Sequence, residues 1–193
     1  RARVNKLPEF LNEMMKGMEP ISGKYVILDD IPEFYNMSNF KLGEKVKVFD
    51  GEGLFLHEMT LQTSLAESNL VGNVYFANYS VWIGRAVDYY LYSTWPKLYM
   101  DENFNSEFVC TKCRIDHLGE AMPFDTINVR MFLKEQYDNG LVISYEIYAN
   151  GDKRLAVASQ SLLWLKRDDQ LKPSIEKVPE VLINKVLKKT QKC

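Results

Sequence analysis

The stretch from Glu67 to Tyr92 constrains the fold of this chain more than any other. It opens with polar turn-forming residues and with Gly72, which has no side chain and therefore permits a tight backbone bend. From about Asn78 onward, apolar residues fall on nearly every side of a helix. The polar positions form one narrow stripe: Ser80, Arg85 and Asp88. Because a helix that is apolar almost all round is buried, and the downstream chain has strand patterns, we expect one central helix wrapped by a sheet.

Composition excludes several classes of protein. The 193 residues, 46% of them hydrophobic, are enough for one good core with room for an extension. A net charge of -2 gives no electrostatic basis for binding nucleic acid. The apolar runs are far shorter than the ~20 residues that cross a bilayer, and no signal peptide is recognisable. We therefore expect a cytoplasmic protein without nucleic-acid or membrane partners.

The three cysteines do not form a disulfide framework, because their number is odd. Cys110 and Cys113 have CxxC spacing, but they lie in a strand-like run. Residues three apart on a regular strand point to opposite faces, so these two thiols are not expected to share a metal ion. Neither His57 nor His117 completes a ligand pattern. We expect reduced thiols, no metal and no cofactor.

Alternation and turn residues predict five strands, over residues 54–61, 108–118, 127–137, 141–149 and 154–166. Asp138-Asn-Gly140 and Asn150-Gly-Asp152 are hairpin turns, where Asn-Gly supplies the positive φ values of a tight turn. Ile127, Val129, Met131 and Leu133 share one face. Short helices are expected after Pro8, from Pro96 and from about Pro179.

The expected domain organisation has three parts. Residues 1–50 form an extension, either an arm packed on the main body or a linker. Residues 51–168 form the main domain, and residues 169–193 form a tail with a short helix. The lysines of this helix could contact an acidic partner, although a solvated helix face is the simpler interpretation: Lys185, Lys188, Lys189 and Lys192.

The order of strand, buried helix and four further strands predicts an α+β fold with an antiparallel sheet around a central helix. Asn69-Leu-Val-Gly-Asn-Val-Tyr-Phe-Ala-Asn-Tyr79, followed by Trp82-Ile-Gly-Arg85, resembles the motif of the hotdog thioesterases of enediyne polyketide biosynthesis. These belong to the wider 4-hydroxybenzoyl-CoA thioesterase-like group. The resemblance continues through Cys113-Arg-Ile-Asp-His-Leu-Gly-Glu120 and Phe124-Asp125, and it spans roughly residues 54–166.

The resemblance implies a hotdog fold and hydrolysis of a thioester that links a polyketide-like or fatty acyl chain to an acyl carrier protein or to CoA. The implied assembly is a homodimer or a dimer of dimers, with sites shared between protomers. The alternative function is a non-hydrolytic hotdog module that binds an acyl chain or dimerises a synthase. A hotdog dehydratase ranks low, because the central helix lacks the expected histidine.

Residue roles follow from the same resemblance. The backbone N–H of Phe76, near the helix start, would stabilise the oxyanion. Asn69 takes the place of the aspartate of the 4-hydroxybenzoyl-CoA branch and could only orient water or substrate. Tyr79 matches an active-site tyrosine, and Glu120 is a candidate acid or base. The expected substrate-binding residues are Gly72, Asn73, Arg85 and Arg114.

Structural interpretations stand beside these roles. Asn69 could be a turn residue or cap, Tyr79 and Tyr75 could be core aromatics, and Glu120 could be a surface carboxylate. Glu67 is a weaker candidate acid or base.

The central helix also departs from the enediyne pattern. Val87 stands where the enediyne branch has an active-site arginine, and Gly84 stands where another hotdog branch has a carboxylate. Arg85 points about 200° away from Val87, so an ion pair with Asp88 is its expected role. The missing cation would have to come from elsewhere, with Arg114 and Lys112 as the candidates.

Overall fold

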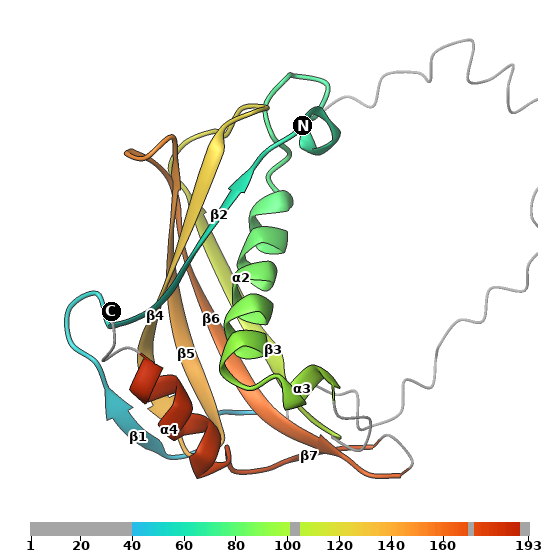
Figure 1. Ribbon diagram of the computed structural model, residues 1–193, viewed down its shortest axis with the longest axis vertical. Coiled ribbons are helices and arrows are strands. Elements are labelled where there is room, and N and C mark those ends of the chain that lie inside the picture. Colours follow the sequence, from blue (N-terminus) through green and yellow to red (C-terminus); the bar gives the residue numbers. More distant parts are fainter. Residues whose placement is uncertain (1–39, 101–104, 170–171, 190–193) are drawn as a thin grey trace, which may run out of the picture. The chain divides into compact units, whose positions relative to one another are not determined.

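One antiparallel sheet organises the chain (Figure 1). The computed structural model describes residues 40–100, 105–169 and 172–189. Within these residues the sheet has seven strands: β1 (Lys45–Val48), β2 (Leu54–Gln62), β3 (Ser106–His117), β4 (Thr126–Tyr137), β5 (Gly140–Ala149), β6 (Lys153–Arg167) and β7 (Pro173–Ile175). The five strands expected from alternation are present within a few residues of their predicted bounds. The helix expected over residues 8–17 lies outside the described residues, as does most of the expected extension.

The strand order is β1-β4-β5-β6-β3, with β2 also pairing with β4 and β7 with β6. β2 covers most of β4, whereas β1 pairs only with its last residues. β3 is therefore the last strand at one side of the sheet, paired through β6 alone among the described strands. This edge position leaves much of β3 exposed.

The central helix α2 (Asn78–Thr94) packs on the sheet with one face. Its buried residues recur at helical spacing: Tyr79, Trp82, Ile83, Ala86, Val87, Tyr90, Leu91 and Thr94. They join a core cluster that includes Ile127, Val129, Met131 and Leu133 of β4, each at most 1% exposed. Burying each large apolar side chain stabilises the fold by about 1.5–3 kcal/mol. This is the α+β hotdog arrangement expected from the sequence.

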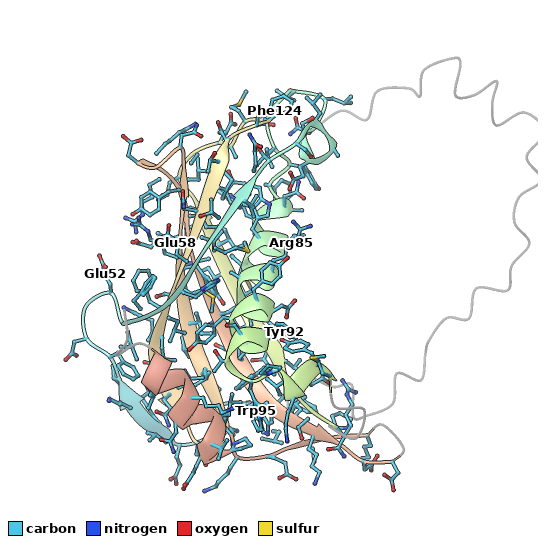
Figure 2. The ribbon with its side chains drawn as sticks, viewed as in Figure 1. Glu52, Glu58, Arg85, Tyr92, Trp95 and Phe124 are labelled. Carbon is cyan, nitrogen blue, oxygen red and sulfur yellow. The ribbon has the colours of Figure 1, made fainter. Side chains whose placement is uncertain are left out.

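The opposite face of α2 is exposed, which the sequence pattern did not indicate. Val81, Tyr89 and Tyr92 are 46%, 59% and 46% exposed. Figure 2 shows Arg85 and Tyr92 on the side of α2 turned away from the sheet. The prediction of a helix buried on nearly every side is therefore wrong for this chain by itself. The exposed face is apolar enough to look buried in a sequence pattern. Tyr99 packs edge-on to Tyr92 at 6.1 Å between ring centroids, but this contact leaves Tyr92 about half exposed.

The C-terminal helix α4 (Glu180–Lys189) is anchored in the core. Val178, Leu182 and Val186 are buried within the main cluster, and the Tyr90 hydroxyl donates to the Val186 carbonyl at 3.2 Å. Lys185 is exposed and lies 5.9 Å from the centroid of the Trp95 ring. The side chains of Lys188, Lys189 and Lys192 lie outside the described part. The described residues also form two short helical segments, η3 (Leu65–Glu67) and α3 (Lys97–Met100). No described helix is long and apolar enough to span a membrane.

The two predicted hairpin turns differ. Asn150 and Gly151 have positive φ values of 53° and 97°, as expected for a tight turn. At the β4–β5 turn, however, neither Asn139 nor Gly140 has a positive φ, so that part of the prediction is wrong. Asn139 is instead held by distant backbone: its Oδ1 accepts from Gly43 N at 2.7 Å and its Nδ2 donates to Lys41 O at 3.1 Å.

Candidate active site

A cleft lies between the loop that precedes α2, the first turn of that helix and the end of β3. Its volume is about 240 Å³. It is lined by Asn69, Asn73, Val74, Phe76, Tyr79, His117, Gly119 and Glu120. The structure thus brings together Asn69, Asn73, Phe76, Tyr79 and Glu120, which the sequence motif nominated. Gly72, Arg85 and Arg114 are not among the lining residues.

The loop before α2 is a tight hairpin closed by a bridge between Ser68 and Val74. Asn69 forms its turn: the N–H of Val71 donates to Asn69 Oδ1 at 2.9 Å, and the N–H of Gly72 donates to Asn69 O at 3.0 Å. Gly72 has a φ of 95°, and an added Cβ would meet no atom within 4 Å. Its glycine is therefore required by conformation rather than by space. The turn interpretation of Asn69 holds in the structure, while its side chain also lines the cleft.

Asn73 lines this cleft but has a buried acceptor without a described partner. Its Oδ1 makes no hydrogen bond with any described residue. Leaving such a group unpaired costs about 1–3 kcal/mol.

The start of α2 is open toward the cleft. Ala77 precedes the helix and no side chain caps it. Among the described residues, the N–H of Phe76 has no hydrogen-bond acceptor, and the Phe76 side chain is 62% exposed. The N–H groups of Asn78, Tyr79 and Ser80 in the first turn donate to carbonyls three residues earlier. The N–H of Phe76 is therefore a donor without a described partner just before the helix start, where the helix dipole favours a negative charge.

Tyr79 binds the backbone of residues 119–121 at one side of the cleft. Its hydroxyl donates to Gly119 O at 3.2 Å and accepts from Ala121 N at 3.1 Å, and the side chain is 2% exposed. Burial raises the pKa of Tyr79, Glu120 and Asp125 raise it further, and the Ala121 N–H opposes the shift. The hydroxyl donates its proton to a backbone carbonyl, so Tyr79 holds the 119–121 segment in place.

His117 is the residue that sequence reasoning missed. Its ring packs edge-on to Tyr79 at 4.8 Å between centroids and to Phe76 at 6.2 Å. Motif and ligand spacing gave it no role, because its neighbours in the cleft come from a different part of the chain. The available signal was strand parity, since His117 shares a face of β3 with Ile115, which packs on the core.

Glu67 is a clamp rather than a member of the cleft. Its Oε1 accepts from Trp82 Nε1 at 3.1 Å, and its Oε2 accepts from Ser64 N at 2.9 Å. Its carbonyl accepts from both Tyr75 N and Asn78 Nδ2 at 2.9 Å. One residue thus ties the loop to the helix start. The Glu120 carboxylate, by contrast, is exposed and makes no hydrogen bond or ion pair within the described part of the chain.

The cations named from the sequence lie away from the cleft. Arg85 is exposed and makes no ion pair with a described residue, so the predicted pair with Asp88 is wrong; Asp88 instead accepts from the Tyr99 hydroxyl at 3.3 Å. Arg114 lies on the opposite face of β3 from His117, because positions 114 and 117 differ by an odd number of residues. Arg114 forms an ion pair with Asp116 at 3.1 Å. Val87 is 8% exposed and packs in the core.

Comparisons with known proteins agree with this geometry. The family model of the Thioesterase-like superfamily matches residues 64–186. The chain therefore belongs to the thioesterase-like superfamily, a class of thioester hydrolases. A search of curated protein sequences returned no match.

Several solved structures share the fold. The dynemicin thioesterase, from a study of polyene binding, is 24% identical with a TM-score of 0.63, covering 69% of this chain and 96% of that chain. A mutant 4-hydroxybenzoyl CoA thioesterase in complex with 4-hydroxybenzoyl CoA is 16% identical with a TM-score of 0.59, covering 67% and 97%. A 1,4-dihydroxy-2-naphthoyl-CoA thioesterase from Synechocystis is 17% identical with a TM-score of 0.58, covering 67% and 94%. These likenesses establish the hotdog fold.

Proposed function

We propose that this chain hydrolyses the thioester between a polyketide or fatty acyl chain and an acyl carrier protein or CoA. The observation that carries the proposal is the uncapped start of α2, which opens into a cleft that also contains His117. The likeness to the dynemicin thioesterase supports a polyketide-like acyl chain. The CoA thioesterases of the same fold support the thioester class.

In the proposed reaction the thioester carbonyl oxygen binds at the N–H of Phe76. Water attacks the carbonyl carbon, and His117 takes its proton as the oxyanion forms. The intermediate collapses by breaking the C–S bond, and the departing sulfur receives the proton from His117. The products are a free acid and a free thiol. The side chain of Asn73 lines the same cleft.

We also propose a homodimer or a dimer of dimers that pairs along β3. The argument is that the outer edge of this twelve-residue strand is unpaired among the described strands and ends at His117 in the cleft. Glu120 would then face a partner protomer at the mouth of the site. Light scattering of the purified protein measures this directly, and a monomer would contradict it.

The second candidate is a non-hydrolytic module that binds an acyl chain. Val87 favours it, because this core position offers no charge to the substrate. Chromatography that detects free acid released from acyl-carrier and acyl-CoA thioesters distinguishes the two functions, because only the hydrolase releases acid. A thiol-reactive dye is unsuitable, since Cys110 and Cys113 are free and exposed.

The decisive variant is His117→Gln, which keeps the size of the side chain and removes its proton acceptor. We expect kcat to fall about 100-fold or more, because the proton acceptor of the proposed reaction is lost. His57→Gln is the matched control, because His57 is the other histidine in the sequence and does not line the cleft. A kcat in His117→Gln that stays within about tenfold of the unmodified protein would contradict the assignment. Acyl binding without any release of acid would favour the second candidate.

A further inference from the structure

The two thiols of the CxxC segment lie on the same face of β3, contrary to the prediction from regular strand parity. The register between β3 and β6 shifts between Cys110 and Lys112, so Thr111 is an extra residue in β3. Such a bulge reverses the alternation of the residues that follow it. Cys110 is opposite Leu162 and Cys113 is opposite Gln160. These two partners are two residues apart on β6 and therefore point to the same side.

The two thiols are exposed to solvent but lie beside a buried polar side chain. Both cysteines are free and exposed, whereas Gln160 beside them is buried. The Tyr145 hydroxyl donates to Gln160 Oε1 at 2.7 Å. Burial raises the pKa of Cys113, and the nearby Cys110 raises it further, as expected for two thiols close enough to interact.

The distance between the two cysteines determines whether a disulfide bond or a metal ion can link their sulfur atoms. Partners two residues apart on a strand place the two Cα atoms roughly 7 Å apart with nearly parallel Cβ vectors. A disulfide needs Cβ atoms about 3.5–4.5 Å apart, so a direct S–S bond would require backbone movement. A bridging ion with metal–sulfur bonds of about 2.3 Å spans sulfur atoms up to roughly 4.6 Å apart. Ordinary rotamers of two neighbouring cysteines reach that separation.

We propose that Cys110 and Cys113 form a two-thiolate binding site for a soft, two-coordinate metal cation of the Cu(I) class. Thiolate ligands select soft ions. Zinc would need four ligands, and the described residues contain no group of three or more potential ligands. Binding converts two thiols to thiolates and releases two protons. Cys113 lies about 13 Å along β3 from His117, so this site is independent of the proposed hydrolysis.

The test is an anaerobic titration of the full chain with Cu(I) against a colorimetric chelator, in a Cys193→Ser background that removes the remaining cysteine. We expect one ion per chain and two sulfur ligands by X-ray absorption. Cys110→Ser and Cys113→Ser should each weaken binding by about 100-fold or more, because a single thiolate loses the benefit of the second. Unchanged affinity in either variant would overturn the proposal, as would one ion per two chains.

A matched control tests the bulge itself. Cys113→Ser combined with Lys112→Cys brings the two thiols closer in sequence but puts them on opposite faces, because Lys112 is opposite Ser161. We expect this double variant to bind no better than Cys113→Ser alone. Tight binding by the double variant would show that sequence proximity, and not the shared face, creates the site. Circular dichroism of each variant verifies that the sheet is retained.

Discussion

Removal of the Glu67 side chain should destabilise the whole fold, although Glu67 lies at the end of the short helix η3 and not in the core. Trp82 is 0% exposed, and its Nε1 donates to Glu67 Oε1. Without that acceptor, a buried donor is left unpaired, at a cost of about 1–3 kcal/mol. The lost hydrogen bond from Ser64 N adds about 0.5–1 kcal/mol, the usual contribution of a cap. We therefore expect Glu67→Ala to lower the free energy of unfolding by about 1.5–4 kcal/mol.

The assay is urea unfolding followed by circular dichroism, which does not depend on the tryptophan signal. In a Trp82→Phe background the donor is already absent, so Glu67→Ala should cost about 1–3 kcal/mol less there. Glu120→Ala is the control, because this exposed carboxylate makes no hydrogen bond within the described residues. Its effect should stay within about 0.5 kcal/mol.

The same residue separates a clamp from a catalyst. Glu67→Gln keeps an oxygen acceptor for Trp82 but cannot exchange a proton. We expect it to retain thioesterase turnover within about tenfold, whereas loss of a general acid or base costs about 100-fold or more. A stable Glu67→Ala variant, or an inactive but stable Glu67→Gln variant, would refute the clamp.

Two further changes test the fold and the loop. Gly140→Ala should destabilise the fold by about 1–3 kcal/mol, because the new Cβ would lie 2.3 Å from the backbone oxygen of Leu162. Gly84→Ala is its control, since a Cβ at that position meets no atom within 4 Å. We expect Gly84→Ala to stabilise α2 by about 0.5–1 kcal/mol in thermal unfolding. Asn69→Asp should keep the turn, because its carboxylate can still accept from the N–H of Val71, and should retain thioester hydrolysis, whereas Asn69→Ala should lower both stability and kcat; equal rates for the two variants would show that the loop turn has no influence on catalysis.

Local patterns predicted the features that depend on local physics. The buried face of β4 followed from alternation, because each of its apolar residues points to the core regardless of partner strand. The Asn150–Gly151 turn followed from residue types that tolerate positive φ. The cleft residues between Asn69 and Tyr79 followed from one contiguous motif, since a loop and the helix that it enters stay together in space.

Features set by distant partners escaped the sequence. Thr111 is extra only relative to the register of β6, and nothing in its own neighbourhood distinguishes it from a regular strand residue. The β4–β5 turn took a different conformation because Asn139 bonds to Lys41 and Gly43, nearly a hundred residues earlier in the chain. His117 enters the cleft because of its place on β3, which no motif of histidine spacing reveals.

Because Val87 offers no positive charge, the N–H groups at the start of α2 become more important for the proposed reaction. No described cation lines the cleft, so the proposed reaction relies on backbone N–H groups and the helix dipole to stabilise the negative charge of the transition state. A sequence does not reveal which backbone N–H groups stabilise a charge, because every residue type except proline carries the same N–H. What the sequence does control is how firmly the helix start is held. Glu67 supplies that control through Tyr75 N and Asn78 Nδ2, on either side of Phe76. A loosened clamp should therefore lower kcat more than it raises KM, because the oxyanion is stabilised only as it forms.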